Sequence, residues 1–80
     1  MNRELIAGFK TQIADNEAQL AQVRRFKSTI YENMVDGMID KAEYQDLRNR
    51  YAAQTKRAQE AINRLREEME RAAGGAGDPP

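Results

Sequence analysis

Cysteine and histidine are both absent from this chain of 80 residues, and its two prolines stand together at the C-terminal end. Without cysteine there is no disulfide and no thiolate ligand. Without histidine there is neither a zinc site of the usual Cys/His kind nor a histidine general base. The only serine is Ser28, in the middle of a predicted helix and without a partner base. This pattern disfavours an enzyme, and it predicts no cofactor and no bound metal.

Long apolar runs are missing as well. No stretch approaches the length of a transmembrane helix, and the N-terminus has no apolar core of the kind found in signal peptides. Charge is abundant but balanced, with 13 basic and 13 acidic residues. We therefore expect one small, soluble, cytoplasmic domain at most, without a small-molecule substrate and without membrane contact.

The midpoint of the chain carries a helix stop and a helix start within four residues. Asp36-Gly37 ends a helix, because glycine adopts the left-handed conformation after a helix without a Cβ clash. Asp40 begins the next helix, and Glu43 follows at the capping-box spacing. Ile39, just before that cap, is placed to pack on Tyr44 as a hydrophobic staple. The chain is therefore predicted to fold back on itself once.

Two amphipathic helices flank this turn, one over about residues 2–35 and one over about 41–73. Their apolar residues alternate at spacings of three and four, the heptad pattern of a coiled coil. In the first helix these residues are Ile6, Phe9, Ile13, Leu20, Val23, Ile30 and Met34, with Asn16 and Lys27 filling the gaps. In the second they are Tyr44, Tyr51, Ala58, Ile62, Leu65, Met69 and Ala72, with Thr55 filling one gap.

The predicted fold is therefore all-α, an antiparallel coiled-coil hairpin with a tight turn at Asp36–Asp40. A single register pairs the two stripes along their whole length, for example Leu20 with Ala58, Ile13 with Leu65 and Lys27 with Tyr51, with Ile30 as a partial exception. An asparagine buried in a seam can set register or oligomeric state, but the interpretation that Asn16 lies at the edge of the seam and hydrates is favoured. The tail over residues 74–80 cannot continue a helix, and we expect a flexible end. Such a hairpin leaves almost no room for a cleft.

Charge is arranged in zones along the hairpin. Acidic residues are missing from 18–31 and from 47–59, two stretches that face each other in the predicted hairpin. These stretches form a basic belt of Arg24, Arg25, Lys27, Arg48, Arg50, Lys56 and Arg57. The turn has the opposite sign, through Glu32, Asp36, Asp40, Glu43 and Asp46 against Lys41 alone. A solvated helix face explains the belt better than direct contact with DNA, since the chain is neutral and has no aromatic stacking platform.

The turn also has the residue types of a damaged EF-hand loop. With Glu32 at the first position, Asp36, Gly37, Asp40 and Glu43 fall at positions five, six, nine and twelve. The third position is Met34, whose side chain supplies no oxygen to a hard cation. Capping explains the same residues fully, so the sequence favours a helix turn over a calcium site.

The run from Phe26 to Tyr51 resembles a known segment, the coiled-coil hairpin inserted in the C-terminal region of large serine recombinases. The matching features are a Tyr-Glu pair, Asp36-Gly37, the step Ile-x-x-x-Glu-Tyr, and Leu47 with Tyr51. These enzymes are the site-specific integrases of phages and mobile elements. Outside the run only the heptad character is similar, from about residue 10 to 71.

The resemblance implies a role in protein–protein contact. In that family the hairpin meets the hairpin of another subunit, helps bring DNA-bound dimers together, and influences whether integration or excision proceeds. Carried onto this chain, the partner-binding residues are Tyr31, Met34, Val35, Met38, Ile39 and Tyr44. DNA would be met only indirectly, through the parent recombinase.

The chain departs from the family in two ways. It has no serine nucleophile with a partner base and none of the cysteines of the family's zinc ribbon. It therefore resembles the hairpin module alone, without the parts that cut DNA. The alternative is a generic structural or regulatory coiled-coil hairpin, since any tight helix turn favours Asp-Gly and capping residues.

Overall fold

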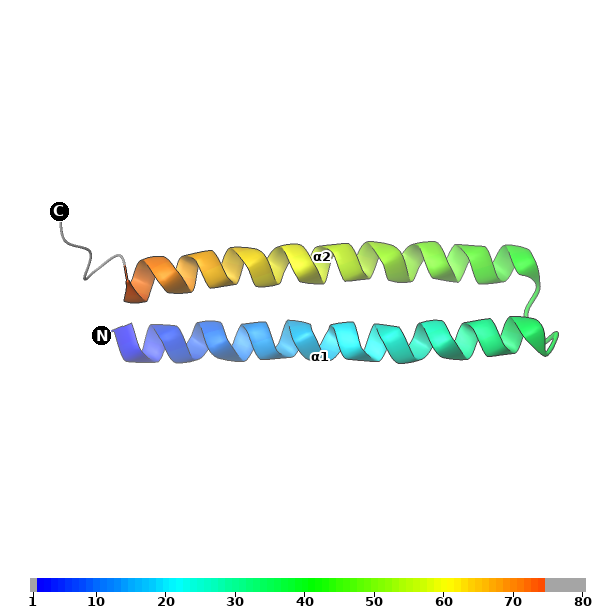
Figure 1. Cartoon of the computed structure of the whole chain (residues 1–80), viewed down its shortest axis with the longest axis horizontal. Coiled ribbons are helices and arrows are strands. Elements are labelled where there is room, and N and C mark those ends of the chain that lie inside the picture. Colours follow the sequence, from blue (N-terminus) through cyan, green and yellow to red (C-terminus); the bar gives the residue numbers. More distant parts are fainter. Residues whose placement is uncertain (1, 75–80) are drawn as a thin grey trace.

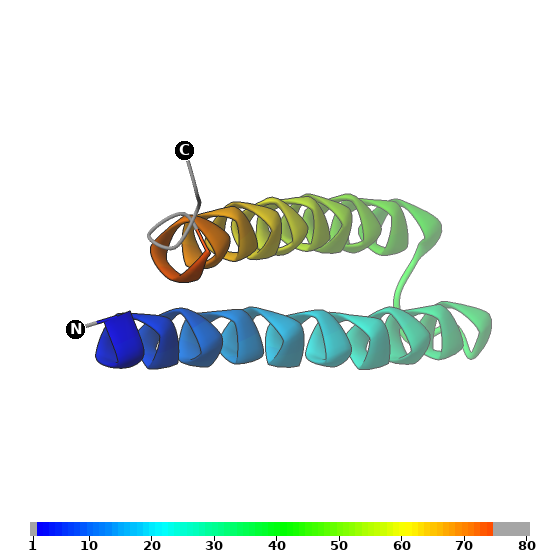
Figure 2. The same cartoon turned by 60° about the vertical axis from the view of Figure 1, so that its left-hand side comes forward.

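Two long helices lie side by side and run in opposite directions. The structure, a computed structural model, describes residues 2–74, with side chains from residue 3 onward. Helix α1 spans Asn2–Val35 and helix α2 spans Lys41–Ala73. The start of α1 and the end of α2 lie at one end of the molecule, and the turn lies at the other (Figure 1). The helices remain neighbours in the view turned by 60° (Figure 2). The predicted all-α hairpin is confirmed.

The hairpin is narrow, because it has a single layer of two helices. Its principal extents are 61 × 19 × 12 Å. The prediction of a flexible tail concerns mainly residues 75–80, which lie outside the described residues. Gly74 still has helical dihedral angles, φ −88° and ψ −40°, and its amide donates to the carbonyl of Glu70.

The core is a short apolar seam between the helices. Its buried residues are Ile13, Val23, Ile30, Ala58, Ile62 and Leu65. The closest-packed part joins Ile13 to Ile62 and Leu65, with Phe9, Leu20 and Met69 packed against it. All of these residues belong to the predicted stripes. The remaining stripe residues of both helices are half-buried.

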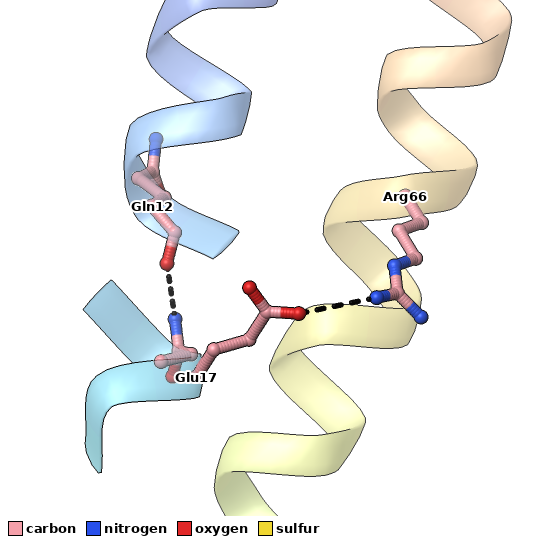
Figure 3. A network of polar contacts seen from close by, with 4 residues as sticks. Gln12, Glu17 and Arg66 are labelled. Atoms are coloured by element: carbon pink, nitrogen blue, oxygen red, sulfur yellow. Dashed lines mark hydrogen bonds and ion pairs between the residues drawn. The ribbon is translucent and has the colours of Figure 1, made fainter. Parts of the chain in front are cut away.

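Asn16 is half-buried and turns its amide toward its own helix. Its Nδ2 donates to the carbonyl of Gln12 at 2.8 Å (Figure 3). The next residue, Glu17, reaches across to α2, where a guanidinium nitrogen of Arg66 lies 3.3 Å from its carboxylate (Figure 3). Both side chains of this ion pair are more than half exposed, so it stabilises the hairpin by less than about 1 kcal/mol.

Candidate protein-contact site

The first helix ends in a Schellman motif. Gly37 has φ +79°, its amide donates to the carbonyl of Met34 at 3.1 Å, and the amide of Met38 donates to Asn33 at 2.8 Å. These are the two hydrogen bonds of that motif, which satisfy the last carbonyl groups of the helix. The left-handed glycine therefore stops α1 and turns the chain toward α2.

The second helix begins with a complete capping box. The Oδ1 atom of Asp40 accepts from the amide of Glu43 at 2.7 Å, and the Oε1 atom of Glu43 accepts from the amide of Asp40 at 3.1 Å. The predicted helix stop and start are both confirmed. Both carboxylates are engaged with the backbone, and the described residues include no group of three or more side chains placed to hold a metal ion.

Large apolar side chains at the turn are open to solvent. Tyr31 is 54% exposed, Val35 is 64% exposed, and Met38 is 74% exposed. The other residues of the predicted partner-binding set, Met34, Ile39 and Tyr44, are half-buried. The structure thus divides the set into three residues that face solvent and three that are partly covered.

The aromatic pair at the turn gives this end of the hairpin a defined shape. The rings of Tyr31 and Tyr44 lie 6.2 Å apart at 66°, an edge-to-face contact between the helices. The predicted staple places Ile39 on Tyr44, and both of these residues are half-buried. One of the three exposed side chains, that of Tyr31, is therefore held in a ring contact with α2.

Acidic groups surround the exposed residues. Glu32 and Asp36 belong to the last turn of α1 and the residue after it, and both are exposed. Among the described residues the ion pairs are Arg50–Asp46, at 3.1 Å, and Arg66–Glu17. Glu32 and Asp36 therefore have no cationic partner, and the turn presents apolar surface inside a negative field.

The basic belt lies farther along the hairpin. Arg24, Arg25, Arg48, Arg50, Lys56 and Arg57 are exposed, and Lys27 is half-buried. Within the described chain only Arg50 of this set has a carboxylate partner. The belt is thus largely free of internal ion pairs, as the two acid-free stretches predict.

One side of the hairpin is hollowed at the level of the belt. A groove of about 500 Å³ lies between the helices there. Its apolar lining consists of Leu20, Val23, Phe26, Tyr51, Ala58 and Ala61. Its polar lining consists of Asn16, Gln19, Gln22, Gln54 and Arg57. The prediction of almost no cleft is therefore too strict, since a groove remains whose lining includes the small side chains of Ala58 and Ala61.

Phe26 is a surface residue that the heptad pattern did not single out. It is 41% exposed, and its ring lies 5.7 Å from that of Tyr51. The predicted register places Lys27 opposite Tyr51. In the structure it is Phe26, the residue before Lys27, that contacts the ring of Tyr51. The sequence did offer a signal for this contact, because Phe26 is a large aromatic residue next to Lys27, a charged residue at a seam position.

None of the described helices is long and apolar enough to cross a membrane. Comparison with protein-family models, with curated proteins and with solved structures finds no match for this chain.

Proposed function

We propose that this hairpin is a protein–protein interaction module that binds another helical hairpin through its turn. The observation that carries the proposal is the exposure of Tyr31, Val35 and Met38 at one end of a narrow molecule. Exposed side chains of this size gain free energy when a partner covers them, about 1.5–3 kcal/mol for a fully buried residue. Met38 is also flexible and polarisable, which suits an adaptable contact.

The resemblance of residues 26–51 to the serine-recombinase hairpin supports the same proposal. It suggests that the partner is the corresponding hairpin of a recombinase subunit, or a second copy of this chain. Contacts of this kind would influence synapsis and the direction of DNA integration or excision. The module itself would act without catalysis, in the cytoplasm, and would reach DNA only through the parent protein.

A generic structural or regulatory hairpin is the alternative. It predicts that the turn residues serve only to connect the helices, so that changing an exposed side chain there has no effect on association. The exposure of Met38 makes this distinction testable, since its replacement removes little buried packing.

Sedimentation equilibrium over a wide concentration range tests the proposal with three proteins: the chain itself, Met38→Asp, and Ala18→Asp. Ala18 is an exposed residue of α1 that lies away from the turn, so it controls for added charge. We expect reversible association that is weakened more than about tenfold by Met38→Asp alone. Equal behaviour of the two variants would contradict a contact at the turn.

A further inference from the structure

The turn and the groove have complementary chemistry. At the turn, the exposed Met38 lies close in sequence to the carboxylates Glu32 and Asp36, which have no cationic partner among the described residues. The groove offers apolar side chains within the basic belt. One surface is thus convex, apolar and negative, and the other is concave, apolar and positive.

Two arginines place positive charge on the groove side of the hairpin. Arg57 lines the groove and has no carboxylate partner among the described residues. Arg50 precedes it by seven residues, so the two lie on one face of α2. Two acidic residues fall within the stretches that line the groove, Glu17, which pairs with Arg66 on the opposite side, and Glu60. Arg50 pairs with Asp46. The other charged residues of these stretches, Arg24, Arg25, Lys56 and Arg57, all belong to the belt.

The turn cannot reach the groove of its own molecule. Phe26 is the groove residue of α1 nearest to the turn, and the helix continues from it to Val35. At 1.5 Å per residue this separates the end of α1 from the groove by roughly 14 Å. Continuous helix joins them, so the chain cannot fold back into its own groove.

We propose that the groove is the docking site for the turn of a second copy of this chain. The proposal rests on the function proposed above and names the surface that receives the turn. Met38 of one copy packs against Phe26 and Tyr51 of the other, and the acidic turn faces Arg57. Two antiparallel hairpins related by a twofold axis make this contact twice, so the pair closes without forming a fibre.

The opposite side of the hairpin supplies the control positions. That side carries the ion pair between Glu17 and Arg66. Ala52 and Gln59 precede Arg66 by fourteen and seven residues, so they belong to the same face of α2. Both are exposed and neither lines the groove.

Cysteine cross-linking tests where the turn binds. The chain has no cysteine of its own, so each introduced thiol is unique. A mixture of the single variants Met38→Cys and Gln54→Cys should form a mixed disulfide under mild oxidation. Met38→Cys mixed with Gln59→Cys should not, since that residue lies on the opposite side. Predominant disulfides between two copies of Met38→Cys, or equal linkage to both glutamine positions, would overturn the proposal.

Sedimentation of Ala61→Glu and Ala52→Glu provides an independent readout. The two variants make the same change on the same helix, one in the groove and one on the opposite face. We expect association to weaken at least tenfold in Ala61→Glu and to stay unchanged in Ala52→Glu, with helical circular dichroism retained in both.

The outcomes separate this inference from the proposed function. A dimer that is sensitive to Met38→Asp and insensitive to Ala61→Glu would overturn docking in the groove while retaining contact through the turn. A chain that remains monomeric at every concentration would overturn docking between copies, and it would remove self-association from the proposed function.

Discussion

Gly8 and Gly37 occupy opposite backbone environments in this hairpin. Gly8 lies inside α1, where a Cβ atom would meet no other atom within 4 Å. Gly37 has φ +79°, a conformation that side-chain-bearing residues adopt only with strain. The same substitution at the two positions should therefore change stability in opposite directions.

We predict that Gly8→Ala stabilises the hairpin by about 0.5–1 kcal/mol, because alanine loses less backbone entropy in a helix. Gly37→Ala should destabilise it by about 1–2 kcal/mol. Thermal melts followed by circular dichroism at one fixed low concentration measure both changes. Shifts of the same sign would show that the turn geometry described here is wrong.

The residues at the turn were predictable from the sequence, whereas the ring contacts between the helices were not. The left-handed glycine and the capping box follow from local rules that need only a few neighbouring residues. The ring contacts of Tyr31 with Tyr44 and Phe26 with Tyr51 depend on the rotation of one helix against the other. A heptad pattern indicates which residues of each helix face the other helix. It does not indicate which aromatic side chains beside that stripe come into contact.

At the scale of a single helix, the stability of α2 depends on its N-cap, Asp40. Asp40 accepts a hydrogen bond from the amide of Glu43, and its own amide donates to that residue in return. We predict that Asp40→Ala costs about 1 kcal/mol of unfolding free energy and that Asp40→Asn, which keeps an acceptor oxygen, costs less. Urea titrations of the two variants measure the difference, and equal midpoints for both would contradict it.

The seam between the helices provides the second test at this scale. Leu65 is 7% exposed and packs with Ile13 and Ile62, whereas Leu5 is 50% exposed. We predict that Leu65→Ala costs about 2–5 kcal/mol and that Leu5→Ala changes stability by less than about 0.5 kcal/mol. Domains of this size have only about 3–5 kcal/mol from a single core, so Leu65→Ala should lose most of its helical signal at 25 °C.

The same seam explains what the sequence did not reveal about the groove. Leu20 faces small residues in the predicted register, and the structure leaves it half-buried beside a hollow. The pairing of Leu20 with Ala58 predicts a closed seam, but a groove remains that Leu20, Ala58 and Ala61 line. The pattern of apolar residues indicates which side chains face each other, but not how much space their packing leaves.

The whole molecule is a narrow hairpin with charge in zones. Balanced totals of 13 basic and 13 acidic residues conceal an acidic turn and a basic belt. We predict that raising ionic strength from about 0.05 M to about 0.5 M weakens self-association, because screening reduces the attraction between unlike zones. Sedimentation at several salt concentrations measures this. An association constant independent of salt would contradict the part assigned to charge.

The most direct test of a contact at the turn is a dilution series of amide NMR spectra on the isotopically labelled chain. Self-association should change the amide chemical shifts of the turn, above all those of Val35 and Met38. The chemical shifts of residues on the outer faces near Ala18 and Ala52 should stay constant. Concentration-dependent shifts confined to those outer faces, with the turn unchanged, would contradict the account.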